Sequence, residues 1–470
     1  MDRPSALDLA FLDLETPQAP LHVGWTLRFG GDAPTVAALR RHLDARLGAV
    51  PRFRRVLRAP GPVWADDPAF DVARHVFGVS AAAGDALRDL AGVLLSQPLP
   101  ADRPLWRMYL VDDADADDGF AIVGQAHHAL IDGVAAIAVA RLLFGPEGDD
   151  VATWIPAAGP SASAARRATA AVRTRALAAA ARDAAGALWP ERPAASSADR
   201  ATAVLREAGR AAEALAQPRE PSALERSASP RRAVAYASVD FAAVRAAGRA
   251  RGATVNDLLL AATSVALRAA LRRRGEPREA LRALVPVSVR EDDAGDSLGN
   301  RLSFLPIELP VGEPDPHRAL ALVAARTAAA KAGGDPGALA ALGRAADALP
   351  GPGRRFVARS ALRALPFALV VSNVPGPPAA LSRLGRPLRA VHPMVPLLHG
   401  HALSIGAVSY DGRLQLGVAA DAEVVDDAAA IAADLEAAFG ALCAAPEAAA
   451  SVTPWRARAR ERRAQRAANR

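Results

Sequence analysis

The sequence is poor in several residue types that carry specific chemistry. Cys443 is the single cysteine among 470 residues, which excludes an intramolecular disulfide and any cysteine-ligated metal cluster. Aromatic residues make up only 4% of the chain, whereas hydrophobic residues make up 51%. The core must therefore be built mainly from alanine, leucine and valine, and any apolar cavity should be lined by aliphatic side chains.

Long hydrophobic segments are also missing. The longest run without Asp, Glu, Lys or Arg, about residues 390–410, contains three histidines, two prolines and two interior glycines, which are poor residues for a membrane-spanning helix. Residues 1–5 lead into an acidic segment and lack the charged and then apolar order of a signal peptide. The sequence therefore predicts a cytoplasmic protein whose contact with lipid is peripheral.

Positive charge is concentrated at the C-terminal end. The net charge is +7, and residues 455–470 hold seven arginines against one acid, Glu461, so this segment alone supplies +6. The rest of the chain is nearly neutral and its few aromatics form no stacking pattern, so we do not expect a nucleic-acid partner. The tail would either attach to an anionic lipid surface or remain solvated, and both interpretations stay open.

Composition and periodicity divide the chain into four parts. Residues 1–150 form a mixed α and β unit, residues 151–232 an Ala- and Arg-rich helical linker, residues 233–445 a second mixed unit, and residues 446–470 the basic tail. This pattern predicts an α/β (α+β) fold with substrates bound between two similar subdomains. We expect strands at 23–29, 106–111, 120–125, 233–239, 284–289, 302–309, 369–373, 402–410 and 413–419, and helices at 36–47, 241–250, 255–272, 319–331 and 428–442, with a further helix that starts at about residue 133.

The clearest chemistry lies in the stretch from His127 to Gly133, which reads HHALIDG. It follows an expected apolar strand, and a strand end holds a side chain rigidly while leaving it exposed to substrate. His128 and Asp132 are four residues apart, so they share a face if the segment turns helically. Transfer of an acyl group from a thioester to a hydroxyl needs one proton removed from the alcohol and one returned to the thiolate. A histidine with a near-neutral pKa can perform both steps.

Other interpretations of the two histidines must be set beside this one. The histidines could be structural, or they could bind a metal, although a zinc site needs three or more ligands and adjacent histidines on a turning loop rarely point the same way. His399 and His401 form a weaker candidate metal pair, and we predict no metal site. The sequence offers no acyl-enzyme nucleophile, because it lacks a G-x-S-x-G motif and Cys443 has no neighbouring base.

The histidine motif is accompanied by further landmarks, and together they resemble the bacterial wax ester synthase/diacylglycerol acyltransferase family, a group of CoA-dependent acyltransferases. The resemblance covers about residues 5–445 and misses only the linker and the tail. HHxxxDG alone is shared with condensation domains, so the accompanying motifs are the more specific part. These are, in order, Leu7-Asp8, His22-Val23-Gly24, Pro104-Leu105-Trp106, Asn256-Asp257, Leu298-Gly299-Asn300, SNVPGP at 372–377 and SYDG at 409–412.

The resemblance implies a fold and the roles of several residues. It implies two chloramphenicol-acetyltransferase-like subdomains with mixed sheets and an active-site tunnel at their interface, where acyl-CoA and the hydroxyl acceptor enter from different sides. His128 would be the general base and His127 a supporting neighbour. Asp132 would orient the loop by pairing with a basic residue, for which we nominate Arg290. An Arg290 that is simply solvated at a strand end is an equally good interpretation.

Five further residues are predicted to support the motif. Gly133 would permit a tight turn or a close backbone approach. Asn256 and Asp257 open an expected helix, where capping is favoured over a chemical role. Ser372 and Asn373 end a buried strand before a Pro-Gly-Pro turn, which could place a hydroxyl or an amide against a tetrahedral oxyanion.

The predicted activity is transfer of a long-chain acyl group from acyl-CoA to diacylglycerol, giving triacylglycerol, or to a long-chain fatty alcohol, giving a wax ester. No cofactor is expected besides the acyl-CoA substrate. Because both substrates are oily, we expect the enzyme at the inner face of the cell membrane or at lipid droplets; the sequence does not specify an oligomeric state. Two alternatives stay open. One is a related acyltransferase acting on a secondary-metabolite hydroxyl or amine, with a carrier-protein thioester as a further possible donor. The other is a catalytically silent lipid-binding protein.

Overall fold

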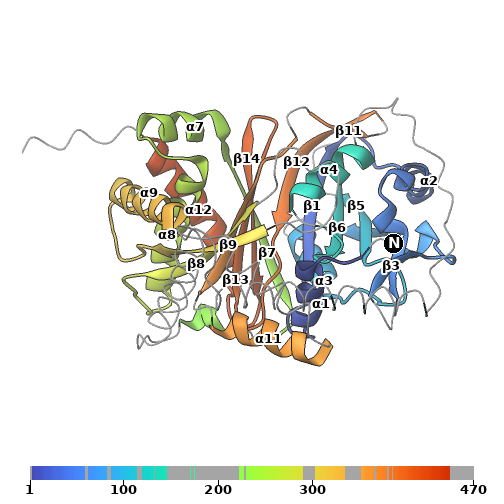
Figure 1. Cartoon of the computed structure of the whole chain (residues 1–470). Helices are drawn as coiled ribbons and strands as arrows, with labels where there is room; N and C mark the ends of the chain where they lie inside the picture. The colour runs from blue at the N-terminus through green and yellow to red at the C-terminus, as the bar shows by residue number, and fades with distance from the viewer. Residues whose placement is uncertain are drawn as a thin grey trace, which may run out of the picture.

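Two six-stranded mixed sheets, each covered by helices, lie beside one another in the computed structural model (Figure 1). This arrangement confirms the predicted α/β class with two mixed sheets. The predicted linker and basic tail fall almost wholly outside the described part of the chain. The structure describes residues 3–58, 62–81, 86–113, 119–131, 133–144, 163, 170, 174, 222–226, 229–288, 302–333, 351–364, 367–377, 380–383 and 385–444.

The first sheet has the strand order β11-β12-β1-β6-β5-β4 and is antiparallel except for the β4–β5 pair. Its strands are β1 (His22–Gly30), β4 (Val76–Ala81), β5 (Trp106–Asp113), β6 (Gly119–His127), β11 (Ser382–Arg383) and β12 (Arg386–Met394). The helices α1 (Ala6–Leu14), α2 (Val36–Arg46), α3 (Ala86–Ser96) and α4 (Gly133–Phe144) accompany it, with a small hairpin of β2 (Arg55–Arg58) and β3 (Val63–Asp66). Short 3-10 helices lie at Leu47–Ala49, Pro51–Arg54 and Val72–Arg74.

The second sheet has the order β7-β14-β13-β10-β8-β9, with parallel pairing at its centre between β13, β10 and β8. Its strands are β7 (Arg232–Asp240), β8 (Leu281–Ser288), β9 (Leu302–Leu309), β10 (Leu369–Val374), β13 (Leu403–Tyr410) and β14 (Arg413–Asp421). The accompanying helices are α7 (Phe241–Ala250), α8 (Val255–Arg273), α9 (Pro316–Gly333), α11 (Gly351–Ala364) and α12 (Ala428–Cys443), with a 3-10 turn at Ala223–Glu225.

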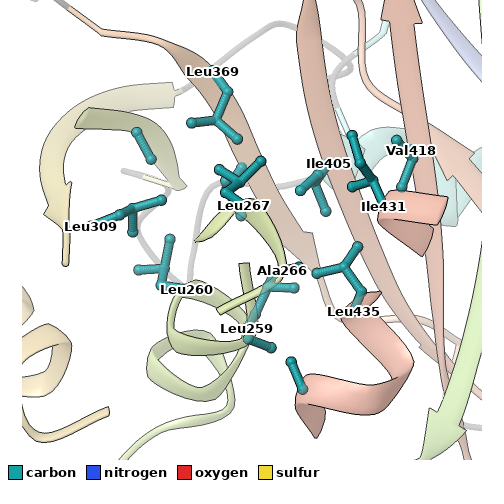
Figure 2. Close-up of a cluster of buried hydrophobic side chains, with 14 of the residues drawn as sticks. Leu259, Leu260, Ala266, Leu267, Leu309, Leu369, Ile405, Val418, Ile431 and Leu435 are labelled. Atoms are coloured by element: carbon teal, nitrogen blue, oxygen red, sulfur yellow. The ribbon is translucent and has the colours of Figure 1, made fainter. Parts of the chain in front are cut away.

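The core of the second subdomain is aliphatic, as the composition predicts. Leu259, Leu260 and Leu267 of α8 are fully buried and belong to one cluster with Leu435 of α12 and Ile405 of β13 (Figure 2). Side chains on nearly every face of α8 are buried, because α9, α12 and the sheet all pack against it. Among the described residues no single helix is long and apolar enough to cross a membrane, and only the pair α7 and α8, bent by 100°, reaches that length when combined.

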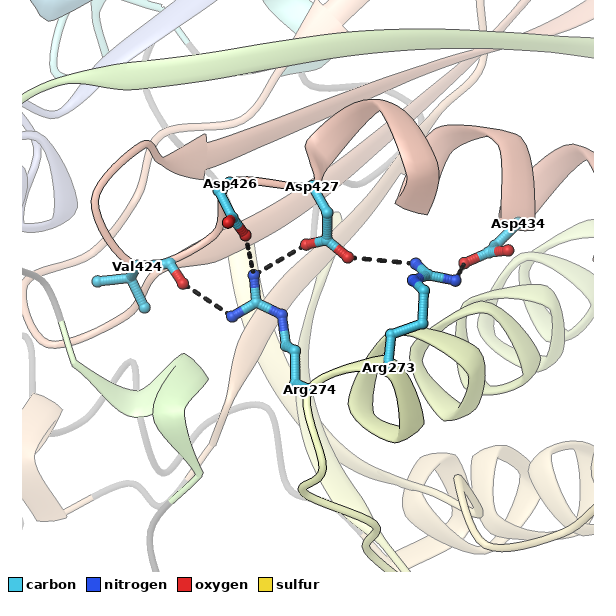
Figure 3. Close-up of polar contacts among 6 residues, drawn as sticks. All are labelled: Arg273, Arg274, Val424, Asp426, Asp427 and Asp434. Carbon is cyan, nitrogen blue, oxygen red and sulfur yellow. Dashed lines mark hydrogen bonds and ion pairs between the residues drawn. The ribbon is translucent and has the colours of Figure 1, made fainter.

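An ion-pair network ties the end of α8 to the start of α12 (Figure 3). Arg274 lies 2.8 Å from one carboxylate oxygen of Asp427 and Arg273 lies 3.2 Å from the other. Arg273 also pairs with Asp434 at 2.7 Å, and Asp426 lies 3.2 Å from Arg274. Burial would raise the pKa of Asp427, but the two guanidinium groups outweigh burial and lower it.

A strand from the second half of the chain belongs to the first sheet, a feature that the expected division by chain order did not include. β12 lies late in the sequence, yet it pairs with β1 in the first sheet, with Gly24 opposite Met394. β12 also lies against the second sheet. Tyr236 of β7 stacks on His392 with 4.4 Å between ring centroids and its hydroxyl is 2.7 Å from that of Thr26 on β1. A buried polar and aromatic contact therefore joins both sheets through β12.

Close approach of β12 to the second sheet requires Gly417 on β14. A Cβ at this position would lie 1.7 Å from the carbonyl oxygen of Pro393, a backbone atom that moves only if the crossing strand moves. We expect Gly417→Ala to lower the free energy of unfolding by about 2–3 kcal/mol, measured by urea denaturation. Gly440→Ala in α12, where a Cβ would meet nothing within 4 Å, is the matched control and should raise stability by about 0.5–1 kcal/mol. Equal stability of the two variants would contradict this account of the crossing.

Most of the predicted elements are present with ends shifted by a few residues. Asp411 and Gly412, which separate the expected strands at 402–410 and 413–419, form the turn of a hairpin and have positive φ values of 45° and 72°. Elements not predicted are α1, α3, α11, β2, β3, β4, β11 and β12.

Candidate active site

The two motif histidines lie at the end of β6, where His127 is the last residue of the strand and His128 follows it. The amide of His127 donates to the carbonyl of Leu105 at 2.9 Å, and the amide of His128 donates to the carbonyl of Leu21 at 2.8 Å. A turn then follows, in which the amide of Leu130 donates to the carbonyl of His127 at 2.8 Å. Backbone hydrogen bonds from two different segments therefore fix where each histidine leaves the sheet.

His128 lies at the boundary between the subdomains. Its half-buried ring stacks on Phe11 of α1, with 4.0 Å between centroids and 17° between planes. Helix α1 begins at a capping box in which Ser5 and Asp8 exchange hydrogen bonds with each other's backbone amides. The cap fixes the start of the helix that carries Phe11.

Apolar side chains from both subdomains gather around this boundary, and we call this group the interface cluster. From the first subdomain come Phe11 and Ala129, the residue after His128. From the second come Leu284 of β8 and Val370 of β10. The full set of buried members is Phe11, Leu21, Ala129, Leu284, Phe367, Val370 and Leu398. An apolar environment of this kind suits an oily substrate beside the half-buried imidazole.

His127 is buried and its tautomer is set by a backbone hydrogen bond. Its Nδ1 accepts a hydrogen bond from the amide of Ala129 at 3.0 Å, so in the neutral ring the proton lies on Nε2. Nε2 lies 3.6 Å from Glu15 Oε2. The other oxygen of Glu15 lies 3.6 Å from Nε2 of His22, which is opposite His127 in the β1–β6 pair. Both separations exceed a direct hydrogen bond, so these contacts are electrostatic.

Glu15 is the site residue that reasoning from the sequence missed. Burial alone would raise the pKa of its carboxyl, but the two imidazoles beside it outweigh burial and lower the pKa to about 2. Burial lowers the pKa of His22, so this ring stays neutral. His22 stood within a family-like landmark, whereas no local pattern pointed to Glu15. We therefore describe a group in which the half-buried carboxylate of Glu15 lies beside the buried rings of His22 and His127.

Glu15→Gln tests how this group supports the site. The change removes a charge facing two buried imidazoles, and we expect a loss of about 1–3 kcal/mol in the free energy of unfolding near neutral pH. The lowered pKa means that the contribution of Glu15 is complete above the ordinary value of 4.5 and disappears as the pH falls towards 2. Urea denaturation as a function of pH should show the two proteins converging within that window.

The control for this prediction is Glu308→Gln, because Glu308 is a surface carboxylate 2.7 Å from Arg326. This variant should change stability by less than about 1 kcal/mol. A stability difference between wild type and Glu15→Gln that persists unchanged at pH 2 would show that the charge is not its cause.

The structure places only part of the remaining motif. Gly133 is the first residue of α4, which extends away from the histidine turn. Asp132 and Arg290 both lie outside the described residues, so their pairing remains a prediction.

Asp257 forms a helix cap together with Thr254. Its carboxylate accepts from the amide of Thr254 at 2.9 Å and the amide of Asp257 donates to the threonine hydroxyl at 3.2 Å, which completes a capping box. The other carboxylate oxygen of Asp257 accepts from the hydroxyl of Thr327 on α9 at 2.6 Å. Asn256 lies beside it in the first turn of α8. These contacts favour the capping role for this pair over a chemical one.

Ser372 and Asn373 occupy opposite faces of β10, because side chains alternate along a strand. Val370 belongs to the interface cluster, whereas Leu369 and Val371 belong to the core of the second subdomain. Ser372 shares the face of Val370 and is half-buried. Asn373 shares the face of Val371. The alternation therefore places Ser372, and not Asn373, on the face that is turned to the histidine loop.

His401 has a structural environment. Its Nε2 lies 2.9 Å from the carbonyl oxygen of Phe367, and its ring stacks on that of Phe367 with 3.8 Å between centroids. Burial lowers the pKa of His401 to about 4. His399 is exposed. Within the part of the chain that is described, no group of three or more His, Cys, Asp or Glu side chains could hold a metal ion.

Profiles of a known protein family match most of the chain. A profile described as the wax ester synthase/diacylglycerol acyltransferase catalytic domain matches residues 5–259, and one described as the C-terminal domain of the same family matches residues 298–442. Together they include the first sheet, the second sheet except β8, and every predicted site residue except Arg290.

Similar sequences extend over almost the whole chain. A protein of Mycobacterium tuberculosis named as a diacylglycerol O-acyltransferase is 33% identical over 462 residues, covering 94% of this chain and 96% of its own. An O-acyltransferase of Acinetobacter baylyi is 27% identical and covers 88% of this chain and 91% of its own.

Solved structures show the same fold. The wax ester synthase/diacylglycerol acyltransferase of Marinobacter aquaeolei has a TM-score of 0.66 at 22% identity, covering 94% of this chain and 98% of its own. The first condensation domain of a calcium-dependent antibiotic synthetase has a TM-score of 0.56 at 17% identity, covering 95% and 97%.

Proposed function

The chain belongs to the wax ester synthase/diacylglycerol acyltransferase family, and from that membership we propose that it is an O-acyltransferase using long-chain acyl-CoA as the donor substrate. The acceptor is the hydroxyl of diacylglycerol or of a long-chain fatty alcohol, and the products are triacylglycerol or wax ester plus CoA. The observation that carries this proposal is the place of His128, at a strand end beside an apolar cluster built from both subdomains.

His128 acts as the general base in a direct transfer. Its imidazole takes the proton of the acceptor hydroxyl while the oxygen attacks the thioester carbon, which forms a tetrahedral intermediate. The intermediate collapses with cleavage of the C–S bond, and the imidazolium returns its proton to the sulfur. Proton balance is complete within one histidine, so no cofactor and no acyl-enzyme is needed. The substrates reach His128 from opposite sides, through a tunnel at the subdomain interface.

The neighbouring residues hold the base in position. His127, with its Nδ1 bonded to the Ala129 amide and its Nε2 facing Glu15, fixes the start of the turn. Asp132 orients the remainder of the loop through Arg290, and Gly133 starts the helix behind it. Ser372 donates its hydroxyl hydrogen to the oxyanion of the intermediate. Its position on the same face of β10 as Val370 of the interface cluster supports this role.

An acceptor panel tests the activity. CoA release from palmitoyl-CoA should require hexadecanol or dipalmitoylglycerol and should be weak with a small amine. A preference for the amine, or for an acyl carrier protein over acyl-CoA as donor, would instead indicate a secondary-metabolite acyltransferase. No CoA release with any acceptor would indicate a silent lipid-binding protein.

We also propose that the enzyme works in the cytoplasm at the inner face of the cell membrane or at lipid droplets, because neither substrate is soluble in water. The arginine-rich tail would strengthen such attachment by about 1 kcal/mol for each basic residue near an anionic surface.

A further inference from the structure

The most exposed large hydrophobic side chain in the described part of the chain is Phe356, at 73% of its full exposure. It lies on α11, a helix that the sequence pattern did not predict. An isolated exposed leucine or valine is ordinary on a protein surface, but a phenylalanine exposed to this degree leaves a large apolar area in contact with water. The residues around Phe356 therefore indicate its role.

The surroundings of Phe356 are basic. The sequence of α11, GPGRRFVARSALRA, contains four arginines and no acid. Arg359 is exposed and lies three residues after Phe356, which places both side chains on the solvent side of the helix. Arg355 is also exposed, although its Nε lies 3.1 Å from the carboxylate of Asp13. Arg354 turns the other way, and its Nε lies 2.5 Å from the buried carboxylate of Asp13 on α1. The outward face of α11 thus combines one large apolar group with flanking positive charge.

Helix α11 lies directly against the candidate active site. It runs beside α1 at the lower edge of the molecule, opposite the end where α7 lies (Figure 1). Arg354 and Arg355 both pair with Asp13, which is two residues from Phe11. Leu362 of α11 packs against the interface cluster, which includes Phe11 and Ala129. One helix therefore presents Phe356 to solvent and contacts the apolar residues around His128 with its inner side.

We propose that α11 is an interfacial helix that seats the enzyme on an anionic lipid surface. Phe356 enters the boundary between headgroups and acyl chains, while Arg359 contacts the anionic headgroups. An oily acceptor leaving that surface would meet the interface cluster and then His128. The role of this helix in acceptor delivery therefore rests on the proposed function. Binding of the helix to lipid, however, is measurable without any turnover.

Charge favours a lipid surface over a second copy of the chain. A twofold dimer through this face would bring two copies of the same helix together, each with four arginines and no acid in its sequence. Like charges at such an interface oppose association. Anionic headgroups instead supply the complementary charge over the whole face.

The test measures binding of the full chain to vesicles of phosphatidylcholine with 30% phosphatidylglycerol, by flotation over a range of lipid concentrations. We expect Phe356→Ala to weaken binding by roughly tenfold. Arg359→Glu should weaken it by roughly 30-fold on these vesicles and hardly at all on pure phosphatidylcholine. The matched controls are Leu322→Ala on α9 and Arg249→Glu on α7, which alter exposed residues away from α11 and should stay within about twofold of wild type.

Each result of these binding measurements either supports or overturns the inference. Unchanged binding of both α11 variants, or no binding of the wild type, overturns it, and so does binding that is lost only when residues 454–470 are deleted. A change from dimer to monomer in Phe356→Ala, seen by analytical ultracentrifugation with vesicle binding intact, would identify a protein interface instead. CoA release from hexanol in vesicle-free buffer should be the same in all variants. Its absence in the wild type would count against the proposed function alone.

Discussion

Replacing His128 with alanine is expected to slow CoA release by roughly 10²- to 10⁴-fold, the usual contribution of a positioned acid-base group. The alcohol is a very weak acid, so without a base its oxygen attacks the thioester only rarely. The thiolate also loses its nearest proton donor. The measurement is steady-state CoA release with palmitoyl-CoA and the preferred acceptor from the panel above.

Two readouts separate chemistry from structure in this variant. Added imidazole should restore part of the activity, since the cavity left beside Phe11 can admit a small base, whereas a folding defect would not respond. His399→Ala, which removes an exposed histidine elsewhere, should retain full activity. Wild-type turnover in His128→Ala would rule out the assigned base.

Ser372→Ala is expected to lower kcat by roughly 10²- to 10³-fold with little change in KM. Negative charge develops on the carbonyl oxygen only as the intermediate forms, so a donor directed at that oxygen stabilises the transition state and not the bound substrate. Alanine removes the hydroxyl while leaving the β10 backbone and its pairing with β13 in place.

Asn373→Ala is the matched control on the opposite face of β10. It should affect stability more than kcat, because Asn373 shares the face of Leu369 and Val371 in the core of the second subdomain. If Asn373→Ala lowered kcat more than Ser372→Ala, the assignment of the oxyanion donor would be wrong.

Elements with a strong local pattern were predictable from the sequence. The long helix α8 begins at a threonine cap and carries leucines at helical spacing, and β13 and β14 flank an Asp-Gly turn that specifies a hairpin. β12 lacked such a pattern. It contains Pro387 and Pro393, which argue against a strand, and its partner β1 lies near the other end of the chain.

The same distinction applies to the site. His128 could be nominated because a strand, a turn and a helix start meet within a few residues. Glu15 could not, because its importance depends on two imidazoles brought to it by the pairing of β1 with β6. Phe356 lies in a segment for which the sequence pattern predicted no element. Long-range contacts, and not local sequence preferences, determine the roles of Glu15 and Phe356.

The contribution of β12 to the first sheet has a consequence for how the protein folds. While the ribosome is still producing residues 1–380, β1 has no neighbour on the side that β12 later occupies, and its backbone groups there form an open sheet edge. The first subdomain can close only after most of the chain has emerged, which makes folding slow and non-local. During that delay the nascent chain is vulnerable to strand-by-strand aggregation, and a fragment ending at residue 150 would keep this edge permanently.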